Sequence, residues 1–143
     1  MKNNFYVLDT NVLVSALIRK NSLPFQVIKI AEKQGIILYS QDTLLEITQV
    51  LNRKKFDKYL TLEERQKFII KFINSSKYVN IQEKISICRD EKDNKLLELA
   101  VSGSANIIIS GDQDLLILNP FREIEIITPE TFINRYNQET HEI

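Results

Sequence analysis

Four acidic residues stand where predicted strands and helices begin, end or pack. Asp9 closes an apolar, strand-like run, and Asp112 follows a second such run by one glycine. Asp93 begins a helical pattern, and Glu46 interrupts the apolar positions of another predicted helix. Because open α/β sheets place their sites at the carboxyl ends of parallel strands, we expect Asp9, Asp93 and Asp112 to share one edge of the sheet. The sequence therefore predicts a cluster of carboxylates.

Carboxylates that converge repel one another, and protonation of one member or a bound cation relieves the repulsion. Oxygen ligands suit Mg²⁺, which is commonly held by a few carboxylates together with water and phosphate oxygens. A pair of such ions, about 3.5–4 Å apart, can activate water on one side of a phosphate and stabilise the leaving oxygen on the other. Zinc is disfavoured because the chain has no cluster of Cys and His side chains. The cluster therefore favours metal-assisted chemistry at a phosphate.

Each of these acids also has a purely structural interpretation. Asp9, Asp93 and Asp112 stand where N-caps stand, and aspartate is a common N-cap. Glu46 is compatible with a solvent-facing position on its helix. Taken singly, each structural interpretation is the simpler one. Three boundary acids on one predicted edge shift the balance toward a shared site.

Three further acids lie near these positions in the sequence. Asp114 can reach a metal through water or cap a short helix, and both alternatives stay open. Asp90 is interpreted as a solvent-facing loop acid. Glu98 lies five residues beyond Asp93, off its helical face, and is expected at the surface.

The elements that must position the acids alternate between strand and helix. Strand-like runs rich in Ile, Val and Tyr occupy residues 5–9, 36–40, 106–110 and 124–128. Helical patterns occupy residues 11–18, 24–33, 42–52, 62–74 and 92–102, and two more follow residues 112 and 128. Because parallel strands need helical crossovers, this order predicts an α/β fold: a three-layer α/β/α open sandwich with a central four- or five-stranded, mostly parallel sheet.

Local signals mark several boundaries within this plan. Thr61 and Glu64 have the spacing of a capping box. Gly35 is expected to end the second helix in a left-handed conformation. Residues 78–81 are a candidate for one more short strand. We expect residues 1–137 to form a single domain and residues 138–143 to form a frayed C-terminal tail.

The charge of the chain is balanced overall but uneven locally. Nineteen Lys and Arg residues match nineteen Asp and Glu residues, so bulk charge does not indicate a nucleic-acid binder. Basic residues nevertheless gather at positions 19–20 and 53–58, which favours either phosphate contacts or a solvated helix end. The residues expected to contact phosphates are Arg19, Lys20, Arg53 and Lys54.

The compartment can also be predicted from composition. A single cysteine, Cys88, excludes an internal disulfide and fits a reducing environment. Neither Cys88 nor the single histidine, His141, stands in a setting typical of a catalytic nucleophile or base. No apolar stretch approaches the ~20 residues needed to span a bilayer. We therefore expect a cytoplasmic protein with no membrane partner.

Four segments, taken in order, resemble a known family. They are VLDTNVLVSAL, LLEI with its embedded acid, RDEKDNKLLELA and IIISGDQDLL. Together they resemble the motifs of PIN-domain proteins over nearly the whole chain, and are most similar to the prokaryotic VapC-like toxins of type II toxin–antitoxin modules. The first segment is distinctive and the second is weak by itself.

The resemblance implies a metal-dependent ribonuclease whose acidic pocket binds Mg²⁺ or Mn²⁺. Four residues match the metal-binding acids of the family, namely Asp9, Glu46, Asp93 and Asp112, with Asp114 as an auxiliary member. Asn11 and Ser110 match polar residues that orient those acids. The presence of Asp90 beside Asp93, and of Asp114 beside Asp112, leaves the individual assignments open.

The resulting hypothesis is hydrolysis of RNA phosphodiester bonds by the toxin of a toxin–antitoxin pair, with a cognate antitoxin protein and a homodimer as implied partners. One alternative keeps the nuclease but assigns it to RNA processing or flap cleavage. Another is a receiver-like phosphoacceptor domain for signalling. A receiver would need a lysine after the last strand, and none follows residues 124–128 in the expected place.

Overall fold

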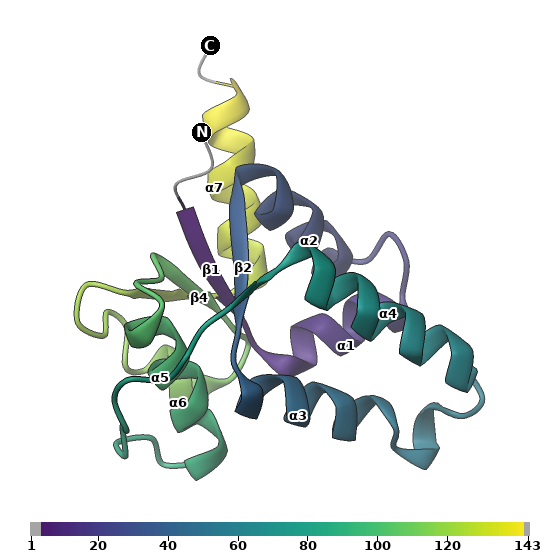
Figure 1. Ribbon diagram of the computed structural model, residues 1–143. Helices are drawn as coiled ribbons and strands as arrows, with labels where there is room; N and C mark the ends of the chain where they lie inside the picture. Colours follow the sequence, from purple (N-terminus) through teal and green to yellow (C-terminus); the bar gives the residue numbers. More distant parts are fainter. Residues whose placement is uncertain (1–3, 142–143) are drawn as a thin grey trace.

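A computed structural model describes the backbone of residues 4–141 and the side chains of residues 4–137. Its centre is a five-stranded sheet with the order β3-β2-β1-β4-β5 (Figure 1). Every pairing in it is parallel. The strands are β1 (Asn4–Leu8), β2 (Gly35–Tyr39), β3 (Lys77–Tyr78), β4 (Ile107–Ile109) and β5 (Glu125–Ile127). The predicted sheet is confirmed, and a short additional strand is present at Lys77–Tyr78 rather than at residues 78–81.

Helices connect the strands, as parallel pairing requires. They are α1 (Thr10–Ile18), α2 (Leu23–Gln34), α3 (Gln41–Leu51), α4 (Leu62–Ser75), α5 (Asn94–Ser102), α6 (Gln113–Leu116) and α7 (Pro129–His141). Two short 3₁₀ turns, Lys54–Phe56 and Glu91–Asp93, lie between them. Figure 1 shows α3 and α4 projecting from the same side of the sheet, with the chain running outward along α3 and back along α4.

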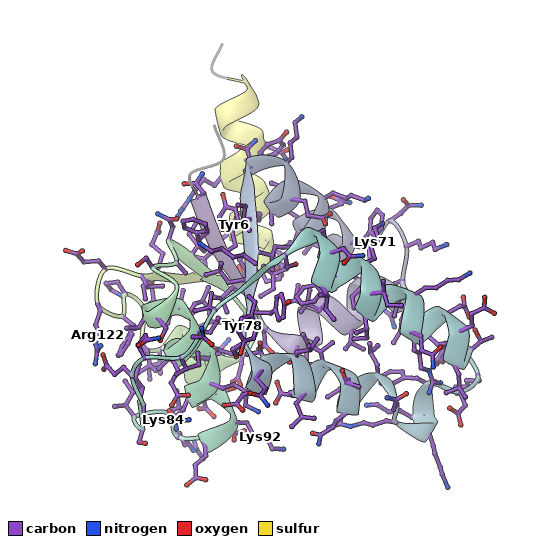
Figure 2. All side chains as sticks on the ribbon, viewed as in Figure 1. Tyr6, Lys71, Tyr78, Lys84, Lys92 and Arg122 are labelled. Atoms are coloured by element: carbon purple, nitrogen blue, oxygen red, sulfur yellow. The ribbon has the colours of Figure 1, made fainter. Side chains whose placement is uncertain are left out.

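The three layers follow from the alternation of side chains along each strand. Tyr6 and Leu8 of β1 pack into a core formed with α1, α2, α3, α4 and α7. Val7, which points the opposite way, packs into a second core formed with α5 and α6. Figure 2 shows Tyr6 inside the molecule, whereas Lys71 and Arg122 lie at its periphery. The predicted α/β/α sandwich is therefore confirmed.

Side-chain caps fix where several helices begin. Thr61 accepts a hydrogen bond from the Glu64 N–H, and the Glu64 carboxylate accepts one from the Thr61 N–H, so the predicted capping box is present. Ser40 and Thr43 form a second such box at the start of α3. This second box starts α3 directly after β2. Glu46 therefore lies in the first half of the helix.

Gly35 has a different role from the expected one. Its φ of −172° is extended, and it forms the first residue of β2 rather than a left-handed helix stop. A Cβ atom at this position would lie 2.2 Å from the carbonyl oxygen of Asn4 on β1. Glycine is therefore required here by the close approach of two strands, not by an unusual backbone conformation.

The C-terminal helix α7 continues to His141, so the backbone of residues 138–141 is helical, while residues 142–143 lie outside the described residues. The predicted domain boundary at residue 137 stays a prediction. Among the described residues, no helix has both the length and the apolar character needed to cross a membrane.

Candidate active site

Asp9 lies between the end of β1 and the start of α1, and only 8% of its surface is exposed. One carboxylate oxygen accepts a hydrogen bond from the Asn11 N–H at 3.3 Å. The other accepts one from the Ser110 hydroxyl at 2.7 Å. Burial raises the pKa of Asp9, the two hydrogen bonds lower it, and the charges of Glu46 and Asp112 raise it further. Asp9 is therefore a desolvated carboxylate within the field of two other acids.

Ser110 connects two of the predicted acids. It is fully buried and follows β4 directly. Its hydroxyl donates to Asp9 and accepts from the Asp112 N–H at 3.0 Å. Asp112 in turn caps α6 by accepting from the Asp114 N–H at 2.9 Å. One hydroxyl thus fixes the carboxylate that follows β1 relative to the backbone that follows β4.

Glu46 points inward from α3 instead of toward solvent. One of its carboxylate oxygens accepts a hydrogen bond from the Thr10 hydroxyl at 2.5 Å, and the other lies 3.2 Å from the Lys95 ammonium. Only 19% of the Glu46 side chain and 24% of the Lys95 side chain are exposed. The ion pair joins α3 to α5, so it draws two predicted site segments together. Because both side chains are partly buried, the pair is screened by solvent and salt less than an exposed pair.

Asp93 lies at the end of the 3₁₀ turn Glu91–Asp93, and α5 begins at Asn94, two residues later than the helical pattern of residues 92–102 indicates. Its side chain makes no cap hydrogen bond, which removes the structural interpretation as an N-cap. Only 8% of Asp93 is exposed. Burial, hydrogen bonding to Asp112 and the nearby charges raise the pKa of Asp93 to about 7. One carboxylate oxygen, Oδ2, is buried and has no hydrogen-bond partner among the described residues.

The four predicted acids therefore influence one another directly. The charges of Glu46 and Asp112 raise the pKa of Asp9, and the charges of Asp112 and Asp9 raise the pKa of Asp93. Asp9 and Asp112 follow β1 and β4, which pair in parallel, so the sheet brings these two acids to one edge. The charge of Glu46 on α3 acts on Asp9, and Asp93, in the turn before α5, hydrogen-bonds to Asp112. The arrangement expected from strand ends is thus present.

The neighbouring acids differ from these four. Asp114 lies in the first turn of α6 and is half-buried, with one carboxylate oxygen 4.0 Å from the Arg89 guanidinium. Asp90 is exposed and caps the 3₁₀ turn through the Lys92 N–H. It is near enough that its charge contributes to the raised pKa of Asp93. Its exposure and its cap hydrogen bond agree with the interpretation of Asp90 as a solvent-facing loop acid.

The expectation that Glu98 lies at the surface is wrong. Glu98 is 6% exposed and accepts a hydrogen bond from the Ile85 N–H at 3.0 Å. Its other oxygen lies 3.9 Å from the Lys84 ammonium. The cause is the long segment after β3, which packs over α5 and covers a helix face that would otherwise be solvated. Glu98 supplies a hydrogen-bond acceptor to that segment, and its partners are Ile85 and Lys84 rather than the acids of the candidate site.

Cys88 also lies beside the acids. Burial and the surrounding negative charges, Asp93 first, raise the pKa of the Cys88 thiol to about 11. A thiol with such a pKa stays protonated at neutral pH and is a poor nucleophile. This agrees with the interpretation from sequence.

A basic groove of about 740 Å³ adjoins the acid cluster. It begins at Asn11, two residues after Asp9, and runs between α1 and the segment that follows α3. Its lining includes Asn11, Ser15, Arg19, Arg53, Lys55, Phe56 and Tyr59. The predicted phosphate-contacting residues Arg19 and Arg53 thus share one groove, which Lys20 and Lys54 do not line.

Sequence reasoning missed Thr10 and Lys95 at the acids, whereas Lys55 of the groove belongs to the basic run 53–58 that it singled out. The signals were present. Thr10 stands between Asp9 and Asn11, where an inward hydroxyl is expected if its neighbours serve a site. Lys95 stands two residues after Asp93, directly before the apolar pair Leu96 and Leu97.

The donor set fits a hard divalent cation in kind. It consists of carboxylate oxygens, which are the ligands that Mg²⁺ and Mn²⁺ prefer. Buried Asp93 Oδ2 lacks a partner among the described residues, and neighbouring charges raise the pKa of Asp9 and of Asp93, so a cation would relieve both costs. Among the described residues, however, no three Asp, Glu, His or Cys side chains lie close enough to ligate one ion. Binding would therefore require rotation of side chains that now hold Lys95, Ser110 and the α6 cap.

Comparison with known proteins places this site in a family. A sequence model described as the PIN domain matches residues 6–114. An uncharacterised protein of Methanocaldococcus jannaschii, MJ1680, is 35% identical over 142 residues, which cover 92% of this chain and 91% of that protein.

Two solved structures have a similar fold. One is described as VapBC2 from Rickettsia felis bound to a DNA fragment from its promoter, with a TM-score of 0.61 and 14% identity, covering 87% of this chain and 98% of that one. The other is PAE2754 from Pyrobaculum aerophilum, with a TM-score of 0.63 and 15% identity, covering 94% and 90%. At this identity the likeness concerns the fold alone. The matched family model covers most of the chain, and this chain therefore belongs to the PIN domain family.

Proposed function

We propose that this protein is a divalent-cation-dependent endoribonuclease, and that it acts as the toxin of a type II toxin–antitoxin pair. The observation that carries the proposal is the convergence of Asp9, Glu46, Asp93 and Asp112 at one sheet edge, where the pKa values of Asp9 and Asp93 are raised. Four acids from separate segments are costly to gather unless a cation neutralises them. Membership of the PIN domain family supports the same assignment.

Asp9, Glu46, Asp93 and Asp112 would hold Mg²⁺ or Mn²⁺, with Asp114 as an auxiliary ligand. When bound, the cation supplies positive charge against the phosphate oxygens and the departing oxygen. Ser110 orients Asp9 by donating to its Oδ2 atom. The Asn11 contribution is its main-chain N–H, because its side chain is exposed. Lys95 holds Glu46 in its inward orientation through the ion pair between α5 and α3.

The RNA strand would follow the basic groove away from the acids. Arg19, Arg53 and Lys55 line that groove and would contact phosphates, which gives affinity without sequence preference. Lys20 and Lys54 are exposed and stay predicted contacts of the flanking backbone. Tyr59 is 58% exposed at the groove, and an exposed ring can stack on an unpaired base. These features favour single-stranded or loop RNA.

The toxin role adds a cognate antitoxin protein and a homodimer to the proposed partners. Its support is the fold shared with a VapBC2 structure, whose description names that pair with promoter DNA. A short neighbouring gene that encodes a DNA-binding domain with a flexible tail would favour the toxin over an RNA-processing or flap-cleaving nuclease. The receiver-like alternative is not retained, because the chain belongs to the PIN domain family.

The test is cleavage of structured and unstructured RNAs with Mg²⁺ or Mn²⁺, with and without a chelator. Asp9→Asn removes one carboxylate, and Asp42→Asn is the matched control because Asp42 is exposed on the first turn of α3. We expect cleavage by the wild type and by Asp42→Asn, and none by Asp9→Asn or in chelator. Cleavage that persists in Asp9→Asn or in chelator would refute the proposal.

A further inference from the structure

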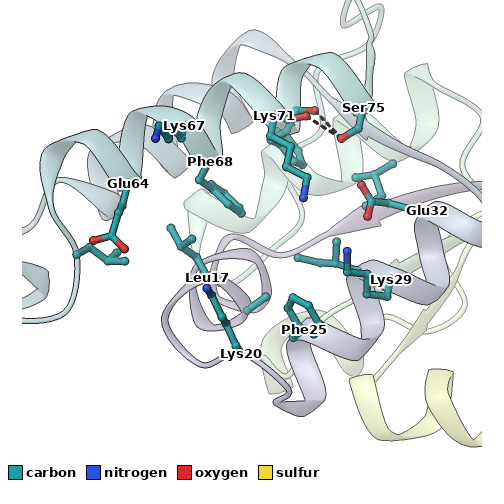
Figure 3. Close-up of a pocket in the computed structure, with 15 residues that line it drawn as sticks. Leu17, Lys20, Phe25, Lys29, Glu32, Glu64, Lys67, Phe68, Lys71 and Ser75 are labelled. Carbon is teal, nitrogen blue, oxygen red and sulfur yellow. Dashed lines mark hydrogen bonds between the residues drawn. The ribbon is translucent and has the colours of Figure 1, made fainter.

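A second cavity, of about 330 Å³, lies among α1, α2 and α4, and none of the acids of the candidate active site lines it (Figure 3). The two cavities share α1 as a wall. Val14, Ser15 and Ile18 face the basic groove, whereas Ala16 and Leu17 face this second cavity. It is therefore a separate feature with its own chemistry.

The inner surface of this cavity is apolar and partly aromatic. Phe25 and Ile28 come from α2, Leu17 comes from α1, and Phe68 and Phe72 come from α4. Figure 3 shows the Phe68 ring directed into the space between the helices and Phe25 on the opposite side. Phe68 and Ile28 belong to the hydrophobics that are only partly buried against the core. The cavity therefore leaves apolar and aromatic surface in contact with solvent.

Four lysines surround this apolar surface. Lys20 follows α1, Lys29 belongs to α2, and Lys67 and Lys71 belong to α4. Two acids, Glu32 and Glu64, also line the cavity, so the lining carries a net charge of +2, four positive minus two negative. Figure 3 shows Lys71 reaching from α4 toward the wall of α2, where Lys29 and Glu32 lie. The chain as a whole has no net charge, so this excess is local.

The acids of the lining and its surroundings do not neutralise this cluster fully. Glu64 accepts the N–H of Thr61 in the capping box of α4, and its charge also acts on Lys20 and Lys67, which leaves Lys29 and Lys71 at the other side of the cavity. Lys67 lies 3.1 Å from Glu63, but both side chains are 75% exposed, and such a pair is weak. Lys29 lies over the Phe25 ring at 5.3 Å, which places its ammonium directly at the apolar wall.

We propose that this cavity binds a small amphiphilic anion, with its aromatic or aliphatic body among Phe25, Phe68 and Leu17 and a single carboxylate, sulfonate or phosphate group at Lys29 and Lys71. Charge complementarity selects an anion, and the apolar lining selects a ligand with a hydrophobic body. The volume falls in the range of sites that enclose whole small molecules, about 300–1,000 Å³. Lys29 on α2 and Lys71 on α4 line the same space from two helices, so both can contact one compact charged group.

The probe for the test is 8-anilinonaphthalene-1-sulfonate, and its neutral counterpart is N-phenyl-1-naphthylamine, which has the same rings without the sulfonate. Lys29→Met/Lys71→Met keeps the apolar stems and removes two charges. Lys33→Met is the matched control, because Lys33 lies on α2 but does not line the cavity. Affinities come from fluorescence titration, and thermal unfolding checks that each variant is folded.

We expect the double variant to raise the Kd of the sulfonate at least about tenfold, the size of one charge-assisted interaction, and to change the Kd of the neutral compound less than about twofold. Lys33→Met should change neither. Amide chemical-shift changes on adding the sulfonate should map to α1, α2 and α4 at the cavity.

Three results would overturn the proposal: equal affinity of the anionic and neutral compounds for the wild type, an unchanged sulfonate Kd in the double variant, or shift changes elsewhere on the protein. Displacement of the sulfonate by an acidic amphipathic peptide, at a lower concentration than a small carboxylate such as dodecanoate requires, would also contradict a small-molecule site. The lysines are exposed, so their replacement does not endanger folding.

Discussion

Replacing Asp93 by Asn should stabilise the protein in the absence of divalent cations. Asp93 is 8% exposed, its pKa is about 7, and its Oδ2 atom has no hydrogen-bond partner among the described residues. The amide has the same shape as the carboxylate and carries no charge. Asp93→Asn therefore removes the repulsion from Asp112 and Asp9 and leaves the packing nearly unchanged.

The sign of the pH dependence follows from the raised pKa of Asp93. The ordinary value is 3.8, so between this value and about 7 the folded protein binds more protons at Asp93 than the unfolded chain does. The contribution of this group to the free energy of unfolding is thus fully present at low pH and is lost as pH rises through the folded-state pKa. A shift of about three pH units corresponds to about 4 kcal/mol for an isolated group.

An amide differs from a carboxyl in its hydrogen bonding to Asp112, so we expect Asp93→Asn to recover only part of this free energy. We expect Asp93→Asn to raise the free energy of unfolding by about 1–3 kcal/mol at about pH 8, and by clearly less at about pH 5. The measurement is urea denaturation with chelator present at both pH values. Glu91→Gln is the control, because Glu91 is exposed and lies two residues from Asp93.

An advantage of Asp93→Asn that is the same at both pH values, or larger at the lower one, would show that carboxylate repulsion is not its cause. A wild type that becomes more stable relative to the variant as pH rises would reverse the predicted sign. Either result would refute the reasoning about a strained acid cluster.

Three further predictions concern other parts of the molecule. Ser110→Ala should lower the free energy of unfolding by about 1–3 kcal/mol, because it leaves a buried Asp9 oxygen and the Asp112 N–H without their partner; urea denaturation measures this. Gly35→Ala should destabilise by more than about 1 kcal/mol, because its Cβ would lie 2.2 Å from a backbone oxygen, and thermal unfolding reports it. Arg19→Met/Arg53→Met should reduce the salt slope of single-stranded RNA binding by about 1.4, measured in chelator by titration at several salt concentrations.

Each of these predictions has a matched control and a contradicting outcome. Ser86→Ala changes an exposed serine, and an equal effect there would contradict the role of Ser110. Gly111→Ala adds a Cβ with nothing within 4 Å, so equal destabilisation would rule out strand proximity as the cause. Lys33→Met/Lys77→Met removes two charges from outside the groove, and an equal change in salt slope would show that RNA does not follow the groove.

The acids at the sheet edge could be predicted from sequence because strand ends and helix starts are local signals. Asp9 and Asp112 follow buried runs directly, and the topology of a parallel sheet then brings them together. The predicted α/β/α layering depends on the same alternation of elements. The strand-end acids and the layering can therefore be predicted without knowing how segments distant in sequence pack against one another.

Features that depend on tertiary packing could not be predicted in this way. Glu98 is buried because the segment after β3 folds over α5, and no local pattern near Glu98 reports that contact. Arg19 and Lys20 are adjacent in sequence but line different cavities, since successive residues at a helix end point in different directions. The inward direction of Glu46 depends in the same way on Thr10 and Lys95, which come from other helices.

Helix α1 has nine residues, so its hydrogen-bonded backbone spans about 13 Å. Asp9 caps one end of it, and its other end forms the partition between the basic groove and the lysine-rimmed cavity. A short helix moves as a stiff rod, because bending it would break several hydrogen bonds at once. Substitutions that change how α1 packs against either cavity therefore act on the helix whose start the Asp9 carboxylate caps.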